Sequence, residues 1–534
     1  MPTPEQIWDD AGLPARRLAG LALNPSSSEV TLLRLLADAP LAARMVLCRD
    51  RDLPEAVVDA VIAHPDRRTR GFFARNPHAD PAQRARLVDD PDWFVRAHLA
   101  EGPRTRFPAW PRPLPDETVV HMISTYDNDI LESLASCRQV SARLVRSMPT
   151  HPVGKVRHWG VNRWQALTEE RRAALLADPD PDVREHAERQ ARFEDPAWVE
   201  SVLPARPCHA RTDFLLHRAL SRAVVDGVLA APAGEDDKAM IAVNPGLPAD
   251  VVVLLAADPD PEVRERIARR PDLGPAERHV LVCDPHPEVR RAVAYRADLG
   301  PAERDALAVD PHPTVRLAVS VHPALTEEQR ARIDYEVPMD RCFGFRIVPV
   351  PTGPPDPEAV RRKALSGHPM LRREAAEDRE LPADLVARLA EDDDLGVRVL
   401  LAQNHPHAPA ALLLRSFLEY TGPERENLIT RPNFPHAGLA ALADHEDPQV
   451  RALVARDPDT APATVDRLTR DPDPDVRAAL ARHPNLPRPR LAELLHDEEL
   501  AHVAAANPAL DPATIDRLLA TDGRNPDPDP GPAA

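Results

Sequence analysis

Apolar residues recur along this chain in short segments that prolines separate. In the most regular stretch, Val263 and Ile267 stand four residues apart, which places both side chains on one face of a helix. Asp260 stands directly before Pro261, and this order is typical of a helix start, where Asp caps free N–H groups and Pro needs none. A second segment from about Pro275 has Leu and Val at three- and four-residue spacing and predicts another short helix.

This two-helix unit recurs every 26 residues. The phrase D-P-x-P-x-V-R marks the start of the first helix of the unit and occupies 258–264, 284–290 and 310–316. The second phrase begins with L-P and occupies 247–257, 381–391 and 486–496. Helices of two to three turns are marginal alone because nucleation is costly, so each must pack on its neighbours. The sequence therefore predicts an all-α chain, an α-solenoid of about eighteen repeats.

The repeats are interrupted twice, which divides the chain into five parts. We expect a capping segment, an array of repeats with an insertion, a loop rich in aromatic residues and proline, a second array and a disordered tail. In that order these are 1–14, 15–334 with the insertion at 101–113, 335–356, 357–520 and 521–534.

Two polar positions repeat with the helices. An arginine ends the first phrase, and an aspartate often stands six residues before it. We expect these arginines to bind carboxylates or carbonyls of their own or the adjacent repeat, although a stripe that grips phosphates or an acidic partner is the alternative. The arginines of this ladder include Arg184, Arg264, Arg290, Arg316, Arg398, Arg451 and Arg477.

A second polar position precedes the prolines that end the first helix. Its side chains are expected to hydrogen-bond backbone groups of the turn. We place there Asn76, Asn244, Asn404 and Asn507, together with His64, His151, His322 and His483.

Net charge and cysteine content limit the classes of function that the sequence favours. The net charge of −18 argues against non-specific binding of nucleic acid, which needs clustered cations. The five cysteines stand far apart, so we expect neither a disulfide framework nor a metal cluster. A basic leader followed by an apolar run is missing, as is an apolar stretch long enough to span a membrane. These features favour a soluble cytoplasmic protein without a cofactor.

The repeat resembles the leucine-rich repeat variant family. The resemblance rests on the 26-residue period, the L-P-x-x-x-L-x-x-L segment and the D-P-x-P-x-V-R-x-x-x-A phrase, and it covers roughly 15–334 and 357–520. It implies a right-handed superhelix of short helices, one of which can be 3₁₀. Some members carry an N-terminal iron–sulfur domain with clustered cysteines. This chain has no such cluster, so that feature is not expected here.

Aromatic residues are scarce and gather near the interruptions. The two insertions either fold back on the repeats or contact a partner, and Trp is frequent in interface hot spots. The residues proposed for partner contact are Phe107, Trp110, Trp159, Trp164, Tyr335, Phe343 and Phe345.

No phosphate-binding loop, nucleophile elbow or zinc-protease motif occurs in the sequence. We therefore expect a non-catalytic scaffold that binds a protein partner along its repeats. The alternatives are a nucleic-acid-binding or base-repair protein with a positive surface, and a regulatory subunit of a neighbouring enzyme.

Overall fold

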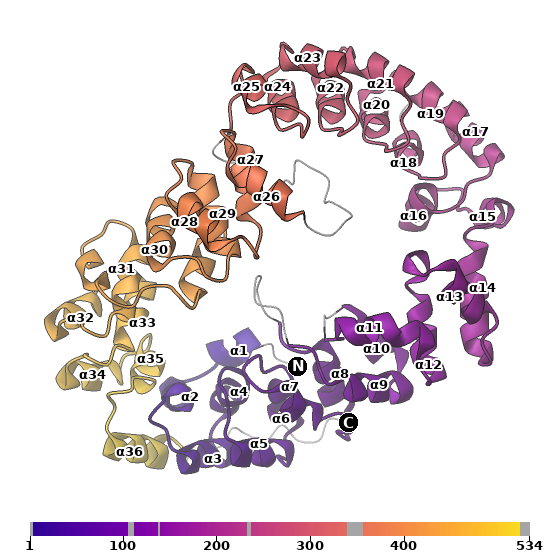
Figure 1. Ribbon diagram of the computed structural model, residues 1–534. Helices are drawn as coiled ribbons and strands as arrows, with labels where there is room; N and C mark the ends of the chain where they lie inside the picture. The colour runs from indigo at the N-terminus through magenta and orange to yellow at the C-terminus, as the bar shows by residue number, and fades with distance from the viewer. Residues whose placement is uncertain (1–3, 105–111, 137–138, 232–235, 339–355, 524–534) are drawn as a thin grey trace. The chain divides into compact units, whose positions relative to one another are not determined.

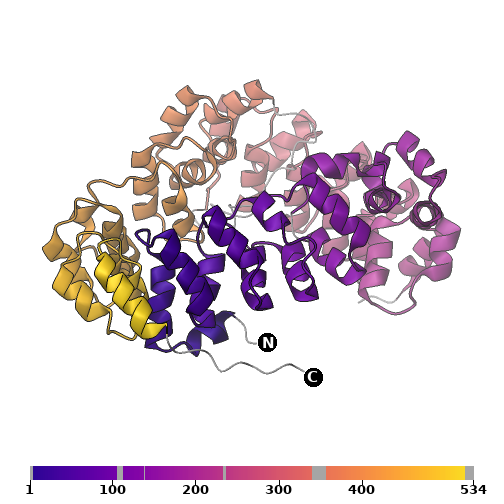
Figure 2. The same cartoon turned by 90° about the horizontal axis from the view of Figure 1, so that it is seen from below.

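The computed structural model describes residues 4–104, 112–136, 139–231, 236–338 and 356–523. All regular elements in these ranges are helical, and helices that follow one another in sequence pack as neighbours (Figures 1 and 2). The chain divides into two compact units, one made of residues 1–184 with 435–534 and the other of residues 185–434. Within each unit the arrangement is that of an α-solenoid, as the 26-residue period predicts.

The first unit takes its helices from both ends of the chain. From the N-terminal part they are α1 (Pro4–Asp9), α2 (Leu13–Leu23), α3 (Glu29–Asp38), α4 (Leu41–Arg49), α5 (Glu55–Ile62), α6 (Arg67–Ala74), α7 (Pro81–Ala85), α8 (Trp93–Glu101), α9 (Asp116–Thr125), α10 (Asn128–Ser136), α11 (Ala142–Ser147), η1 (Met148–Thr150), α12 (Gly154–Val161), η2 (Trp164–Ala166) and α13 (Glu169–Leu176). From the C-terminal part they are η5 (Leu439–Leu442), α31 (Pro448–Ala452), η6 (Leu453–Arg456), α32 (Pro462–Leu468), α33 (Pro474–Ala481), α34 (Arg488–Leu494), α35 (Ala501–Ala505) and α36 (Pro512–Asp522).

The second unit is continuous in sequence, and the boundary falls within α14 (Pro181–Arg192). Its further helices are α15 (Pro196–Val202), α16 (His209–His217), α17 (Arg222–Ala230), α18 (Asp237–Ala242), α19 (Ala249–Leu255), α20 (Pro261–Ala268), α21 (Pro275–Val282), α22 (Pro287–Ala294), α23 (Pro301–Ala308), α24 (Pro313–Ser320), α25 (Glu327–Ala331), α26 (Pro357–Ala364), α27 (Pro369–Ala376), α28 (Ala383–Ala390), α29 (Leu395–Asn404), α30 (Ala410–Glu419) and η4 (Arg425–Thr430).

The local signals in the sequence place the helices of the regular repeats. Helix α20 begins at Pro261, and the Asp260 side chain accepts a hydrogen bond from the first turn. Thr326 and the glutamine three residues later form a capping box at the start of α25. The first helices of successive repeats, such as α20, α22 and α24, pack side by side. They bury Val263, Val289 and Val315 at equivalent positions, so the core is a row of small clusters.

The recurring arginines join each repeat to the next. Nε and Nη2 of Arg264 donate to the two carboxylate oxygens of Asp284, 20 residues further on, at 2.6 and 2.9 Å. Its Nη1 donates to the carbonyl of Asp258 in its own loop at 2.8 Å. The same two-pronged contact recurs between Arg70 and Asp90, Arg157 and Asp178, Arg290 and Asp310, Arg372 and Asp392, and Arg451 and Asp471.

Other members of the predicted arginine ladder have different partners. Arg398 binds Glu419, Arg477 binds Glu499 and Arg316 reaches Asp334. Arg184 donates to the Asp178 carbonyl. Each of these four arginines still donates from Nη1 to a carbonyl of its own loop, so the loop contact is retained where the carboxylate partner changes.

Each ladder aspartate is also fixed by its own loop. Asp284 accepts a hydrogen bond from the His286 N–H at 2.8 Å, and Asp471 accepts one from the Asp473 N–H at 2.9 Å. The hydrogen bond from Arg451 lowers the pKa of Asp471, because it favours the charged carboxylate. Asp471 therefore stabilises the fold above its unfolded pKa, and this contribution is lost as the pH falls below about 4.

In the second polar ladder, a side chain that follows the first helix of one repeat donates to carbonyls at the end of the first helix of the preceding repeat. Nδ2 of Asn244 donates to the carbonyls of Leu215 and Arg218, both at 2.9 Å. Its Oδ1 accepts from the Gly246 N–H at 2.8 Å. Equivalent bonds are made to the preceding repeat by Asn76, Asn507, His405 and His483.

The composition of this second ladder differs in part from the prediction. His64 and His151 stand before the first helix, at the position that aspartate fills in other repeats, and their Nδ1 atoms accept from their own loops. Asn404 donates within its own helix to the Leu400 carbonyl. Arg270 and Arg296, which the pattern did not single out, donate to the carbonyls of the preceding repeat instead.

The first two residues of the predicted tail are helical. Thr521 and Asp522 belong to α36, and the Asp522 carboxylate accepts hydrogen bonds from Arg17 at 2.7 and 2.9 Å. A run of Asp, Gly and Pro predicted disorder from 521, but this long-range pair holds the last turn of the helix. Residues 524–534 lie outside the described residues.

We predict that Asp284→Asn lowers the free energy of unfolding by about 1–3 kcal/mol, because a charge-assisted contact to Arg264 is lost in a mostly buried place. Chemical denaturation followed by circular dichroism measures this change. Asp250→Asn is the matched control, since its pair with Arg222 is exposed and should contribute little. Equal effects of the two substitutions would contradict the ladder's role.

Candidate partner-binding surface around Arg96

The arginine ladder changes at α8, where the first insertion follows. Nη1 of Arg96 makes the usual loop contacts, to the carbonyls of Asp90 at 2.7 Å and Pro91 at 3.1 Å. The residue 20 positions further on, Asp116, binds Ser141 and Arg143 instead. Among the residues that the structure describes, no carboxylate pairs with Arg96.

A tyrosine occupies the place next to Arg96. The guanidinium carbon of Arg96 lies 5.9 Å from the centre of the Tyr126 ring. The Tyr126 hydroxyl donates to the Val88 carbonyl at 2.6 Å, which fixes the ring between the two loops. Burial raises the pKa of Tyr126, so the hydroxyl stays a hydrogen-bond donor. The ring contacts the guanidinium by a cation–π interaction, and none of the described residues supplies an acceptor to Nε or Nη2 of Arg96.

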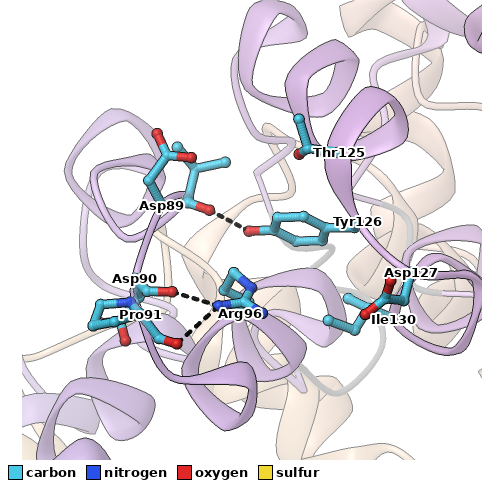
Figure 3. A pocket seen from close by; sticks show the side chains of 9 residues that line it. Asp89, Asp90, Pro91, Arg96, Thr125, Tyr126, Asp127 and Ile130 are labelled. Atoms are coloured by element: carbon cyan, nitrogen blue, oxygen red, sulfur yellow. Dashed lines mark hydrogen bonds between the residues drawn. The ribbon is translucent and has the colours of Figure 1, made fainter.

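A cavity of about 230 Å³ opens at this position (Figure 3). Two of its carboxylates are already paired, because Asp90 binds Arg70 and Asp89 contacts His121 at 2.7 Å. A comparable cavity of about 340 Å³ lies beside Arg372, where Asp392 holds the guanidinium. The cavity at Arg96 is lined by Val88, Asp89, Asp90, Pro91, Arg96, Thr125, Tyr126, Asp127 and Ile130.

An exposed tryptophan stands about one helical turn before Arg96. Trp93 is 52% exposed and begins α8, three residues before Arg96. Residues three apart on a helix lie on the same side of it. The Asp92 carboxylate caps the helix by accepting a hydrogen bond from the Phe94 N–H, and this contact fixes the start of α8 at Trp93. An open guanidinium and an exposed indole therefore lie close together on one surface.

The aromatic residues proposed from the sequence do not gather into one site. Trp164 is buried, with Arg172 over its ring, and Trp159 is half-buried against the core. Tyr335 stacks on His368 with ring centres 4.2 Å apart. Phe107, Trp110, Phe343 and Phe345 lie outside the described residues. Trp93 is not among the residues proposed from the sequence, and its exposure in the structure distinguishes it.

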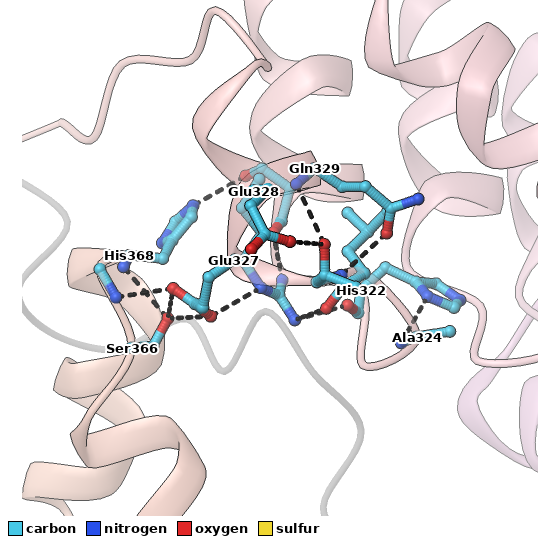
Figure 4. A network of polar contacts seen from close by, with 12 residues as sticks. His322, Ala324, Glu327, Glu328, Gln329, Ser366 and His368 are labelled. Carbon is cyan, nitrogen blue, oxygen red and sulfur yellow. Dashed lines mark hydrogen bonds and ion pairs between the residues drawn. The ribbon is translucent and has the colours of Figure 1, made fainter.

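A polar network connects helices on the two sides of the second insertion in sequence, and it is buried at Ser320, Ser366 and His368 (Figure 4). The Glu327 carboxylate accepts from the Ser366 hydroxyl and from the Gly367 N–H, and so holds the start of α27. His368 Nε2 and the Ser320 hydroxyl are 2.8 Å apart. This network ties α24 and α25 to α27, which the insertion separates in sequence.

The serine–histidine contact in this network is oriented for structure. Nδ1 of His368 accepts from the Met370 N–H at 3.1 Å, so Nε2 carries the proton of the neutral ring. The Ser320 hydroxyl in turn donates to the Leu317 carbonyl at 2.7 Å. The histidine therefore donates to the serine and does not act as its base.

No group of three or more His, Cys, Asp or Glu side chains in the described ranges is arranged to hold a metal ion. Within the same ranges no helix has both the length and the apolar composition needed to cross a membrane.

We predict that His368 makes stability depend on pH. Burial and the neighbouring arginines lower the pKa of His368 to about 4. The unfolded state therefore takes up a proton near pH 6.5 that the folded state does not, and stability is lost as the pH falls from about 6.5 towards 4. In His368→Gln the thermal unfolding of the second unit should depend less on pH over this range. Parallel curves for the two proteins would contradict the assignment.

Comparison with known proteins finds a family model that matches one repeat of the chain. The family model described as leucine rich repeat variant matches residues 474–499, which span α33, α34 and most of the loop that follows α34. No curated protein that was compared matches this chain. The matched segment holds the ladder arginine Arg477 and its partner Glu499. The chain is therefore a helical repeat protein, and one of its repeats matches the leucine rich repeat variant model.

Proposed function

We propose that this chain is a non-catalytic scaffold that binds a protein partner at the surface formed by α8, α9 and the loops around Arg96. In this proposal Arg96 receives an acidic side chain of the partner. The observation that carries it is the open edge of the Arg96 guanidinium inside a cavity, at the position where six other repeats hold an aspartate.

The chemistry of the cavity favours a carboxylate. Nε and Nη2 of arginine form a planar fork that matches the two oxygens of a carboxylate, as the pair Arg264–Asp284 illustrates within this chain. Asp90 competes little for Arg96, because Arg70 already holds its two oxygens. Trp93 offers an exposed apolar area next to this polar contact, and Trp and Arg together are typical of interface hot spots.

A protein partner fits this surface better than a nucleic acid. Asp89 and Asp127 line the cavity and would repel a phosphate backbone, whereas a protein segment brings one carboxylate and neutral neighbours. Most ladder arginines are neutralised by carboxylates, so they add little positive field. The net charge of −18 acts in the same direction.

We predict that Trp93→Ala and Arg96→Gln each weaken partner binding by about 30-fold, as expected for truncation of a hot-spot residue that contributes about 2 kcal/mol. Arg96→Lys should also bind more weakly, because lysine keeps the charge but lacks the fork. Affinity purification from the native cell with quantitative mass spectrometry identifies the partner, and titration with the purified partner measures affinity.

Leu254→Ala is the matched control, because Leu254 is 57% exposed on α19, far along the chain. It should retain the partner at the wild-type level, and circular dichroism should show that all variants are folded. A partner that is retained by both Trp93→Ala and Arg96→Gln would refute this surface. Recovery of a nucleic acid without a specific protein would refute the function itself.

A further inference from the structure

The two ends of the chain meet in the first unit. Helix α2 packs against α35 and α36, although about 480 residues separate them in sequence. Figures 1 and 2 both place α36 beside the N-terminal helices. Gly20 lies at the closest approach, since a Cβ atom there would stand 2.1 Å from the His502 carbonyl oxygen. We call this contact between α2 and the pair α35–α36 the end joint.

The end joint has the same bonds as the contacts between successive repeats. Nδ2 of Asn24 donates to the carbonyls of Ala505 at 2.9 Å and Asn507 at 2.8 Å. Asn507 itself makes this double contact to the repeat before it, at 2.8 and 2.9 Å. The Oδ1 atom of Asn24 accepts from its own loop, as that of Asn507 does. The first repeat therefore occupies the place of a repeat that follows the last.

Charged side chains add contacts that are specific to the end joint. Arg17 binds both oxygens of Asp522, and the two side chains are 12% and 6% exposed. Arg16 donates to the Glu498 carbonyl at 2.8 Å. The Trp8 ring meets His502 edge-on with ring centres 5.1 Å apart. This combination of a fork contact and shape match selects one pairing of the two ends.

Opening the end joint would expose apolar surface on both sides. Helix α2 buries Leu18 and Leu21 completely, and α35 buries Val503 and Ala505 in the same core cluster. An apolar repeat face of this kind must pack against another repeat, because a solenoid is stable only while each repeat has its neighbours. The contacts that the structure describes at the end joint are all non-covalent, so another chain with the same end could pack there in place of the chain's own end.

We propose that the end joint is exchangeable and that a second copy of this chain is its partner. In the exchanged form the first repeat of one copy docks on the last repeat of the other, and the reverse contact forms at the same time. Every buried bond of the end joint is then kept, as in domain swapping, and the cost is the entropy of association. The single chain dominates when dilute, and the exchanged dimer forms at high concentration.

Two charge reversals test this exchange. In Arg17→Glu alone and in Asp522→Arg alone, like charges meet within each chain. When the two variants are mixed, each end meets an end of opposite charge on the other copy. The expected result is a one-to-one complex of twice the single-chain mass in native mass spectrometry and light scattering. The double variant in one chain restores the pair and should remain a folded single chain.

Gly20→Leu serves as the steric control. Added to both charge variants, it should abolish the complex, because the side chain would collide with the His502 backbone in either partner. A mixture that stays at the single-chain mass while the double variant folds would overturn the proposal. A second readout uses no charge change: concentrated wild-type protein should form dimers that Gly20→Leu lacks. Dimers that are unaffected by Gly20→Leu, or no dimers at all, would also overturn it.

Discussion

The structure depends on one constraint, which is that helices of about eight residues cannot satisfy their own ends or bury their own apolar face. Each repeat therefore completes the one before it. Ladder arginines reach the aspartate of the next repeat, and asparagine or histidine side chains reach carbonyls of the preceding one. These contacts recur because the same backbone groups are left open in every turn of the array.

The same constraint explains how irregular places are tolerated. At the second insertion Glu327 and His368 connect helices that the insertion separates in sequence. At the first insertion Tyr126 is fixed by Val88, so the packing is kept while the Arg96 fork loses its carboxylate. At the ends of the chain Asn24 repeats the contact that Asn507 makes. A change in the polar partner therefore creates a candidate binding place without breaking the array.

The sequence predicts the regular repeats well because the signals are local. Asp260 before Pro261 marks a helix start wherever it occurs, and the period fixes which apolar positions face the core. The candidate surface could not be predicted in the same way. The open fork of Arg96 depends on a residue 30 positions away that fills the place of an expected aspartate, and the role of Asp522 depends on Arg17 at the other end. Burial of Trp164 and exposure of Trp93 follow from packing, which residue type does not determine.

The most direct test of the account is a double-mutant cycle between Arg290 and Asp310, because this pair lies in the most regular part of the array. Arg290→Gln, Asp310→Asn and the double variant would be unfolded with denaturant, and the three losses of stability compared. The account predicts a coupling free energy of about 1–3 kcal/mol across the two repeats. Losses that simply add would mean that the ladder does not hold neighbouring repeats together.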